Sequence, residues 1–93
     1  MPRALRYTTG FQGLTPEALR AAVVEIVARE ARAYGGCGML LIHCNLPAWD
    51  DRAATRQARQ EHLRRALANL VRTGALVKVG KGSRAEYRPG AGS

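Results

Sequence analysis

Aromatic residues are scarce in this chain, at 5% of its 93 residues. The length allows one small domain with a modest core, which must be built mainly from Leu, Val, Ile and Ala. No apolar run is long enough to span a bilayer, and the amino terminus lacks the apolar segment of a signal peptide. We therefore expect no membrane partner, and a cytoplasmic, nucleoid-associated location.

Cysteine is also rare, with only Cys37 and Cys44 in the chain. Since a cytoplasmic location is expected, both thiols should be reduced. Together with His43 and His62 they provide four potential zinc ligands, but the Cys-x-x-Cys and His-x-x-x-His spacings of zinc sites are missing. No catalytic triad pattern or phosphate-binding loop occurs either. We expect no bound metal, no cofactor and no enzymatic activity.

Acidic residues are nearly absent from the second half of the chain. Residues 1–51 hold five Arg and five acids, which cancel, whereas residues 52–93 hold ten Lys or Arg against Glu61 and Glu86, so 10 − 2 gives the entire net charge of +8. Such concentrated positive charge favours a polyanionic partner, because each neutralised phosphate releases condensed counterions. The alternative is a basic face that is merely solvated.

The clearest helix is predicted within "LTPEALRAAVVEIVAREARAYGG", residues 14–36. Thr15 is a good N-cap, Pro16 suits the first turn, and Gly35 and Gly36 end the pattern. One apolar stripe at helical spacing should face the core: Leu19, Ala22, Val23, Ile26 and Val27.

A second stripe of small apolar residues lies elsewhere on this helix: Ala21, Val24, Ala28 and Ala31. It is a candidate for close contact with a second copy of the chain in a homodimer. The alternative is a solvated helix face with good helix propensity. Residues 1–13, before this helix, are expected to form a flexible arm.

The continuous apolar run "GMLLIHCN", residues 38–45, predicts a short buried strand, although periodicity alone does not exclude a short helix. A further helix is predicted between Ala48 and Thr73, because this stretch contains no Gly or Pro and Asp50 or Asp51 can cap its start. Its core stripe consists of Leu63, Ala66, Leu67, Leu70 and Val71.

The start of this second long helix is polar where it should face the core. Projected backward, the apolar stripe reaches Gln60, Arg59 and Arg56. Either one helix extends beyond the core, or a break near residues 55–60 separates two helices.

A β-hairpin is predicted after Gly74, because "ALVKV" and "RAEYR" alternate on either side of "GKGS". Ala85 and Tyr87 should share one face of the hairpin, with Arg84, Glu86 and Arg88 on the other. Residues 89–93 are expected to be a disordered tail. The fold class is thus α+β, with the order helix, strand, one or two helices, hairpin.

The stretch "LRRALANLVRTGALVKVGKGSRAEYR" resembles the recognition helix and wing of winged helix-turn-helix proteins. The shared features are the helical apolar spacing, "TGAL" entering a strand, and a basic turn that contains glycine. The resemblance covers residues 57–88 well and residues 16–44 loosely, without identifying one family. It implies a winged-helix-like domain over residues 14–88 that binds duplex DNA as a small transcriptional regulator or a mobile-element accessory factor.

Long polar side chains early in the helix are suited to reading base edges in a major groove: Arg56, Gln57, Arg59, Gln60 and His62. Other cations of the helix and hairpin are suited to the DNA backbone: Arg64, Arg65, Lys78, Lys81, Arg84 and Arg88. Two alternatives stay open, namely an RNA-binding or ribosome-associated protein that uses the same face, and a winged-helix module that binds other proteins.

Overall fold

The computed structural model describes residues 9–11, 13–47 and 56–90. In chain order, this part contains the helix α1 (Pro16–Tyr34), the strand β1 (Cys37–Gly38), the helix α2 (Met39–Asn45), the helix α3 (Arg56–Arg72), the strand β2 (Leu76–Val79), the 3₁₀ turn η2 (Gly82–Arg84) and the strand β3 (Glu86–Pro89). The predicted α+β class is confirmed.

Capping explains both ends of α1. The backbone N–H of Ala18 donates to Thr15 Oγ1 at 3.2 Å, which satisfies one of the free amides of the first turn. At the other end Gly35 has φ = 84°, a left-handed conformation that glycine adopts without steric cost, and its N–H donates to the Ala31 carbonyl. The predicted helix is confirmed with these bounds.

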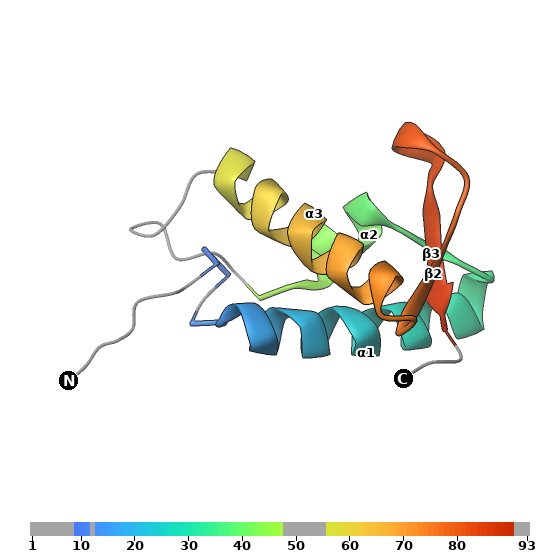
Figure 1. The fold of residues 1–93 in the computed structure, drawn as a ribbon, viewed down its shortest axis with the longest axis horizontal. Helices are drawn as coiled ribbons and strands as arrows, with labels where there is room; N and C mark the ends of the chain where they lie inside the picture. Colours follow the sequence, from blue (N-terminus) through green and yellow to red (C-terminus); the bar gives the residue numbers. More distant parts are fainter. Residues whose placement is uncertain (1–8, 12, 48–55, 91–93) are drawn as a thin grey trace.

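The core lies between α1, α3 and the sheet. Leu19, Val23, Ile26 and Val27 of α1 are buried, as are Leu63, Ala66, Leu67 and Leu70 of α3. Ala22 and Val71, at the margins of the two predicted stripes, pack against this cluster. In Figure 1, α3 crosses over α1, and the hairpin rises at the end of the molecule where α3 finishes.

The sheet has three antiparallel strands in the order β1-β3-β2. Lys78 lies opposite Tyr87 and Val77 opposite Arg88, while Cys37 of β1 pairs with Tyr87 from the other side. Because neighbouring residues of a strand point to opposite faces, Lys78 and Tyr87 share one face of the hairpin and Arg88 lies on the other. Ala85 and Tyr87, which were predicted to share one face, are both buried, whereas Glu86 and Arg88 are exposed.

The predicted strand over residues 38–45 is wrong. Only Cys37 and Gly38 form a strand, and Met39–Asn45 form α2. Met39, Ile42 and Leu46 all pack on the core, with the three- and four-residue spacing of a helix face. Leu40 is largely exposed, and this exposed leucine made the run look like a continuously buried strand.

The expected flexible arm and disordered tail also differ from the structure at their inner ends. Thr9 and Phe11 are buried, and Phe11 belongs to the core cluster. At the other end β3 includes Pro89, and the Gly90 N–H donates to the Ala75 carbonyl at 2.9 Å. The remaining parts of both predicted segments, and residues 48–55 with the predicted aspartate cap, lie outside the described residues.

Candidate nucleic-acid interface

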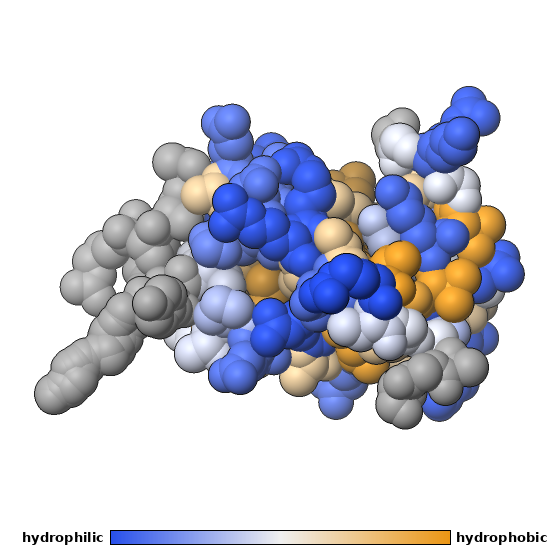
Figure 2. All heavy atoms as spheres, viewed as in Figure 1, coloured by the Kyte–Doolittle hydropathy of each residue, from blue (hydrophilic) through white to orange (hydrophobic). Residues whose placement is uncertain are grey.

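The exposed face of α3 and the hairpin tip form the candidate interface. Both the amino-terminal end of α3 and the tip lie on the side of the molecule turned away from α1 (Figure 1). Hydrophilic residues cover this face of α3 and the end of the hairpin (Figure 2). Lys81 and Arg84 are exposed at the tip, beside Gly80 and Gly82.

One groove joins the helix to the hairpin, and we call it the hairpin-side groove. Arg64 and Arg72 of α3 and Lys78 of β2 line it, around a floor that includes Leu67 and Tyr87. Burial raises the pKa of Tyr87, which keeps this phenol neutral beneath the three cations. Two of the predicted backbone-contacting residues, Arg64 and Lys78, are thus brought together from separate elements.

A second recess lies on the other flank of α3, and we call it the α1-side pocket. Its polar lining consists of Arg20 from α1, of His62, Arg65 and Asn69 from α3, and of the buried Thr9 that precedes α1. His62 is therefore placed beside α1, apart from Arg64 and the hairpin. Its predicted partners in base reading, Gln57 and Gln60, do not line this pocket.

Glu61 lies between these two flanks. Its Oε1 accepts a hydrogen bond from Arg64 Nη1 at 2.7 Å, and its Oε2 lies 3.4 Å from Arg65 Nε. Glu61 is the only acid of α3, and all three side chains are substantially exposed. Exposed pairs of this kind contribute only about 0.2–1 kcal/mol each, so a phosphate can compete for either arginine.

Arg59 does not occupy the position predicted for it. Its side chain is buried, with 7% of the residue exposed, and its guanidinium carbon lies 5.9 Å from the centre of the Phe11 ring. The Phe11 ring in turn meets His43 edge-on, with centroids 5.6 Å apart. Because Phe11 extends the core beneath the start of α3, Arg59 packs inward. The sequence prediction that Arg59 lies on the exposed, base-reading side of α3 is therefore corrected: the side chain belongs to the packed interior.

His43 contacts the Phe11 ring, over which the Arg59 guanidinium also lies. Burial lowers its pKa from the ordinary value of 6.5, and the charges of Arg59 and Arg56 lower the pKa further. Within the described residues, its Nε2 is buried without a hydrogen-bond partner. Both observations favour the neutral imidazole at neutral pH.

Arg88 is also placed away from the other hairpin cations. It lines a recess on the opposite face of the sheet, together with Arg32, Ala28 and Ala31 of α1. Two residues of the predicted dimer stripe, Ala28 and Ala31, are therefore half-covered by the hairpin, and Val24 packs against the core. Ala21 alone of this stripe is fully exposed.

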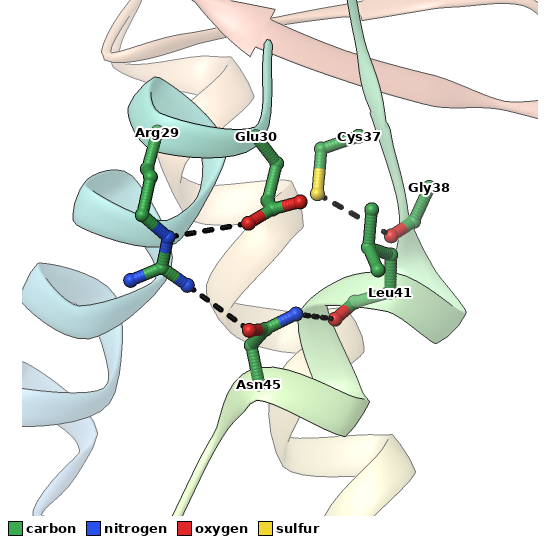
Figure 3. Close-up of polar contacts among 6 residues, drawn as sticks. All are labelled: Arg29, Glu30, Cys37, Gly38, Leu41 and Asn45. Carbon is green, nitrogen blue, oxygen red and sulfur yellow. Dashed lines mark hydrogen bonds and ion pairs between the residues drawn. The ribbon is translucent and has the colours of Figure 1, made fainter. Parts of the chain in front are cut away.

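The two cysteine thiols differ in exposure, and Cys37 is the buried one. Burial, and next the charge of Glu30, raise the pKa of the Cys37 thiol to about 11, so it is protonated at neutral pH. Figure 3 shows this thiol pointing to the Gly38 carbonyl, while Arg29 binds Glu30 and donates from Nη2 to Asn45 Oδ1 at 3.0 Å. The Arg29–Asn45 hydrogen bond links α1 to α2. Cys44 is a free, exposed thiol.

The part of the chain that the structure describes lacks two further features. Among residues 9–11, 13–47 and 56–90, no group of three or more His, Cys, Asp or Glu side chains is arranged to hold a metal ion. No helix in this described portion has the length and apolarity needed to cross a membrane.

Sequence reasoning missed three residues that line the two recesses. Arg72 follows Arg64 by two helical turns, so helical spacing alone would have placed both near one flank of α3. Arg20 and Asn69 enter the α1-side pocket only because α1 packs against α3, and no local pattern signals that contact.

The order of elements and the sheet topology are compatible with a winged helix. No protein-family model, curated protein or solved structure matches the chain.

Proposed function

We propose that this protein binds duplex DNA with α3 and the hairpin, as a small winged-helix regulator or mobile-element accessory factor that makes and breaks no covalent bonds. The observation that carries the proposal is the hairpin-side groove, where Arg64 and Arg72 of α3 meet Lys78 of β2. A polyanion in this groove contacts both elements at once, and guanidinium and ammonium groups are the usual ligands of phosphate oxygens.

The division of work within the interface follows from side-chain position. Gln57 and Arg56 are exposed and Gln60 is half-buried at the amino-terminal end of α3, the part of a recognition helix that reaches base edges. Lys81 and Arg84 at the glycine-containing tip can approach a backbone or a minor groove. Arg59 and Arg88 are not included, since the first is buried and the second lies on the other sheet face.

A titration that compares nucleic acids tests this function. A labelled random-sequence DNA duplex and a structured RNA of equal charge are each titrated with the protein at several salt concentrations. We expect the duplex to bind more tightly, with an affinity that falls steeply as salt rises. Preference for the RNA would support the ribosome-associated alternative. Binding of neither nucleic acid would reject the proposal and leave the protein-interaction alternative.

Sequence specificity and symmetry need a second experiment. Selection of bound fragments from a random duplex pool should yield a consensus, because Gln and Arg side chains distinguish base edges. A palindromic consensus would indicate two copies on the DNA, and sedimentation of the free protein would show whether the homodimer forms without DNA.

A further inference from the structure

The α1-side pocket has a chemistry that the proposed helix–hairpin contact does not use. Its charged and amide side chains come from two helices: Arg20 reaches it from α1, and His62, Arg65 and Asn69 reach it from α3. Thr9, which precedes α1, also lines it. Its floor is apolar, with Leu19 and Ala66 both buried. The Thr9 hydroxyl already donates to the Leu14 carbonyl and accepts from the Phe11 N–H, so the polar groups for a ligand are those of the two helices.

The donors in this pocket favour an anion with several oxygen atoms. Arg20 and Arg65 bring two positive charges, and the Asn69 amide adds neutral N–H donors. No acidic side chain of the described residues lines the pocket. Arg65 directs its Nε toward Glu61, but a guanidinium has five N–H donors, so this one contact leaves donors for a ligand.

We infer that the α1-side pocket binds a phosphate group, held between Arg20 and Arg65 with Asn69 as a further donor. Arginine forks match the geometry of phosphate oxygens, and two arginines from separate helices fix its position. This inference rests on the proposed function for the identity of the phosphate: it belongs to the same duplex that α3 contacts.

The position of the pocket supports the DNA duplex as the source of the bound phosphate group. A helix in a major groove about 12 Å wide lies between two phosphate backbones, one on each flank. The hairpin-side groove gathers Arg64, Arg72 and Lys78 on one flank of α3, and the α1-side pocket gathers Arg20 and Arg65 on the other. The two recesses then hold phosphates of opposite strands. The other possible source is a small phosphate monoester.

The test compares Arg20→Gln with Arg32→Gln. Both changes remove one positive charge from α1, and both keep a good helix former, but Arg32 lies outside the pocket. Arg20→Gln should weaken binding to every duplex and reduce the slope of log affinity against log salt by about one phosphate contact. Arg32→Gln should do neither. Equal melting temperatures of the two variants serve as the control for folding.

A second arm uses inorganic phosphate and two-dimensional NMR. In the wild type, phosphate should shift the Arg20 Nε–H and Asn69 side-chain signals saturably, and Arg20→Gln should abolish the Asn69 shift. This result with equal duplex affinities for the two variants would identify a small phosphate ester as the ligand. The same result with no duplex binding by the wild type would reject the proposed function and leave the pocket in place. Equal duplex affinities without saturable shifts would overturn the inference.

Discussion

The Glu61 carboxylate and the Arg64 guanidinium form a hydrogen-bonded ion pair, with Nη1 and Oε1 2.7 Å apart on the exposed face of α3. Glu61 lies on the surface that we propose to face a polyanion. There its carboxylate repels phosphates and forms an ion pair with Arg64, a cation that could otherwise bind a phosphate. The arrangement leads directly to a prediction about its removal.

Glu61→Gln should tighten duplex binding, because it removes the repulsion and releases Arg64 and Arg65 for phosphates. An exposed ion pair is weak, so the expected gain is about two- to fivefold at low salt and smaller at high salt. Fluorescence anisotropy with a labelled duplex measures it. Weaker binding by this variant would mean that Glu61 accepts a hydrogen bond from the DNA, as a carboxylate can from a cytosine amino group.

The two faces of the hairpin should differ in their contribution to binding. Lys78 lines the hairpin-side groove, whereas Arg88, on the adjacent strand, lies on the opposite sheet face. Lys78→Gln should weaken all duplexes by about two- to tenfold and make the salt slope smaller by about one. Arg88→Gln is the matched control, with equal loss of charge and no effect. Equal losses in both variants would contradict the assignment of one binding face.

Replacement of Arg59 should lower the stability of the fold and should not change base recognition directly. Its side chain is buried over the Phe11 ring, so Arg59→Ala should lower the free energy of unfolding by about 1–3 kcal/mol through lost packing and cation–π contact. Urea denaturation measures this loss, with Arg56→Ala as the exposed control on the same helix. A fully stable Arg59→Ala variant with altered base preference would contradict this prediction and indicate that Arg59 contacts DNA bases.

Acid should destabilise the protein through His43. Its pKa is lower in the folded chain than the ordinary value of 6.5, so the unfolded chain binds the proton more readily. The stabilising effect of the neutral imidazole is complete above about pH 6.5 and is lost as the pH falls through the folded-state pKa.

The free energy of unfolding, measured in urea between pH 7.5 and about pH 5, checks this pH dependence. His43→Gln should flatten the profile over this range, because the variant has no group to titrate at this position. An unchanged slope in the variant would assign the acid sensitivity to other groups.

The long helices and the hairpin could be predicted because local patterns determine them. In α1 the Thr15 cap, the apolar stripe and Gly35 all indicate the same helix. A segment is predictable when its capping residues and its hydrophobic periodicity agree in this way. Alternation also predicted that Ala85 and Tyr87 share one face of the hairpin, and both are buried in the structure.

The short second helix could not be predicted in the same way. Four consecutive residues from Met39 to Ile42 are apolar, so the sequence conceals which of them face the core. Gly38 ends a strand of only two residues and caps the helix without a side-chain hydrogen bond, which leaves no recognisable start signal.

The candidate interface was predicted in part. The basic character of α3 and of the hairpin tip is visible in the sequence, and helical spacing brings Arg64 to the hairpin flank. The inward packing of Arg59 depends on Phe11, and the α1-side pocket depends on Arg20, which is 45 residues from Arg65 in the chain. Contacts this distant arise from tertiary packing and leave no local pattern.

The central claim, that α3 and the hairpin contact one duplex through a common surface, is tested most directly by NMR mapping of the bound DNA. Backbone amide signals of the wild-type protein are followed during titration with a duplex chosen from the selected pool. We predict saturable shifts at the start of α3, around Arg64 and at Lys78 and Lys81, with little change at Arg88. Shifts that are confined to the opposite face of the molecule, around Arg32 and Arg88, would contradict the account.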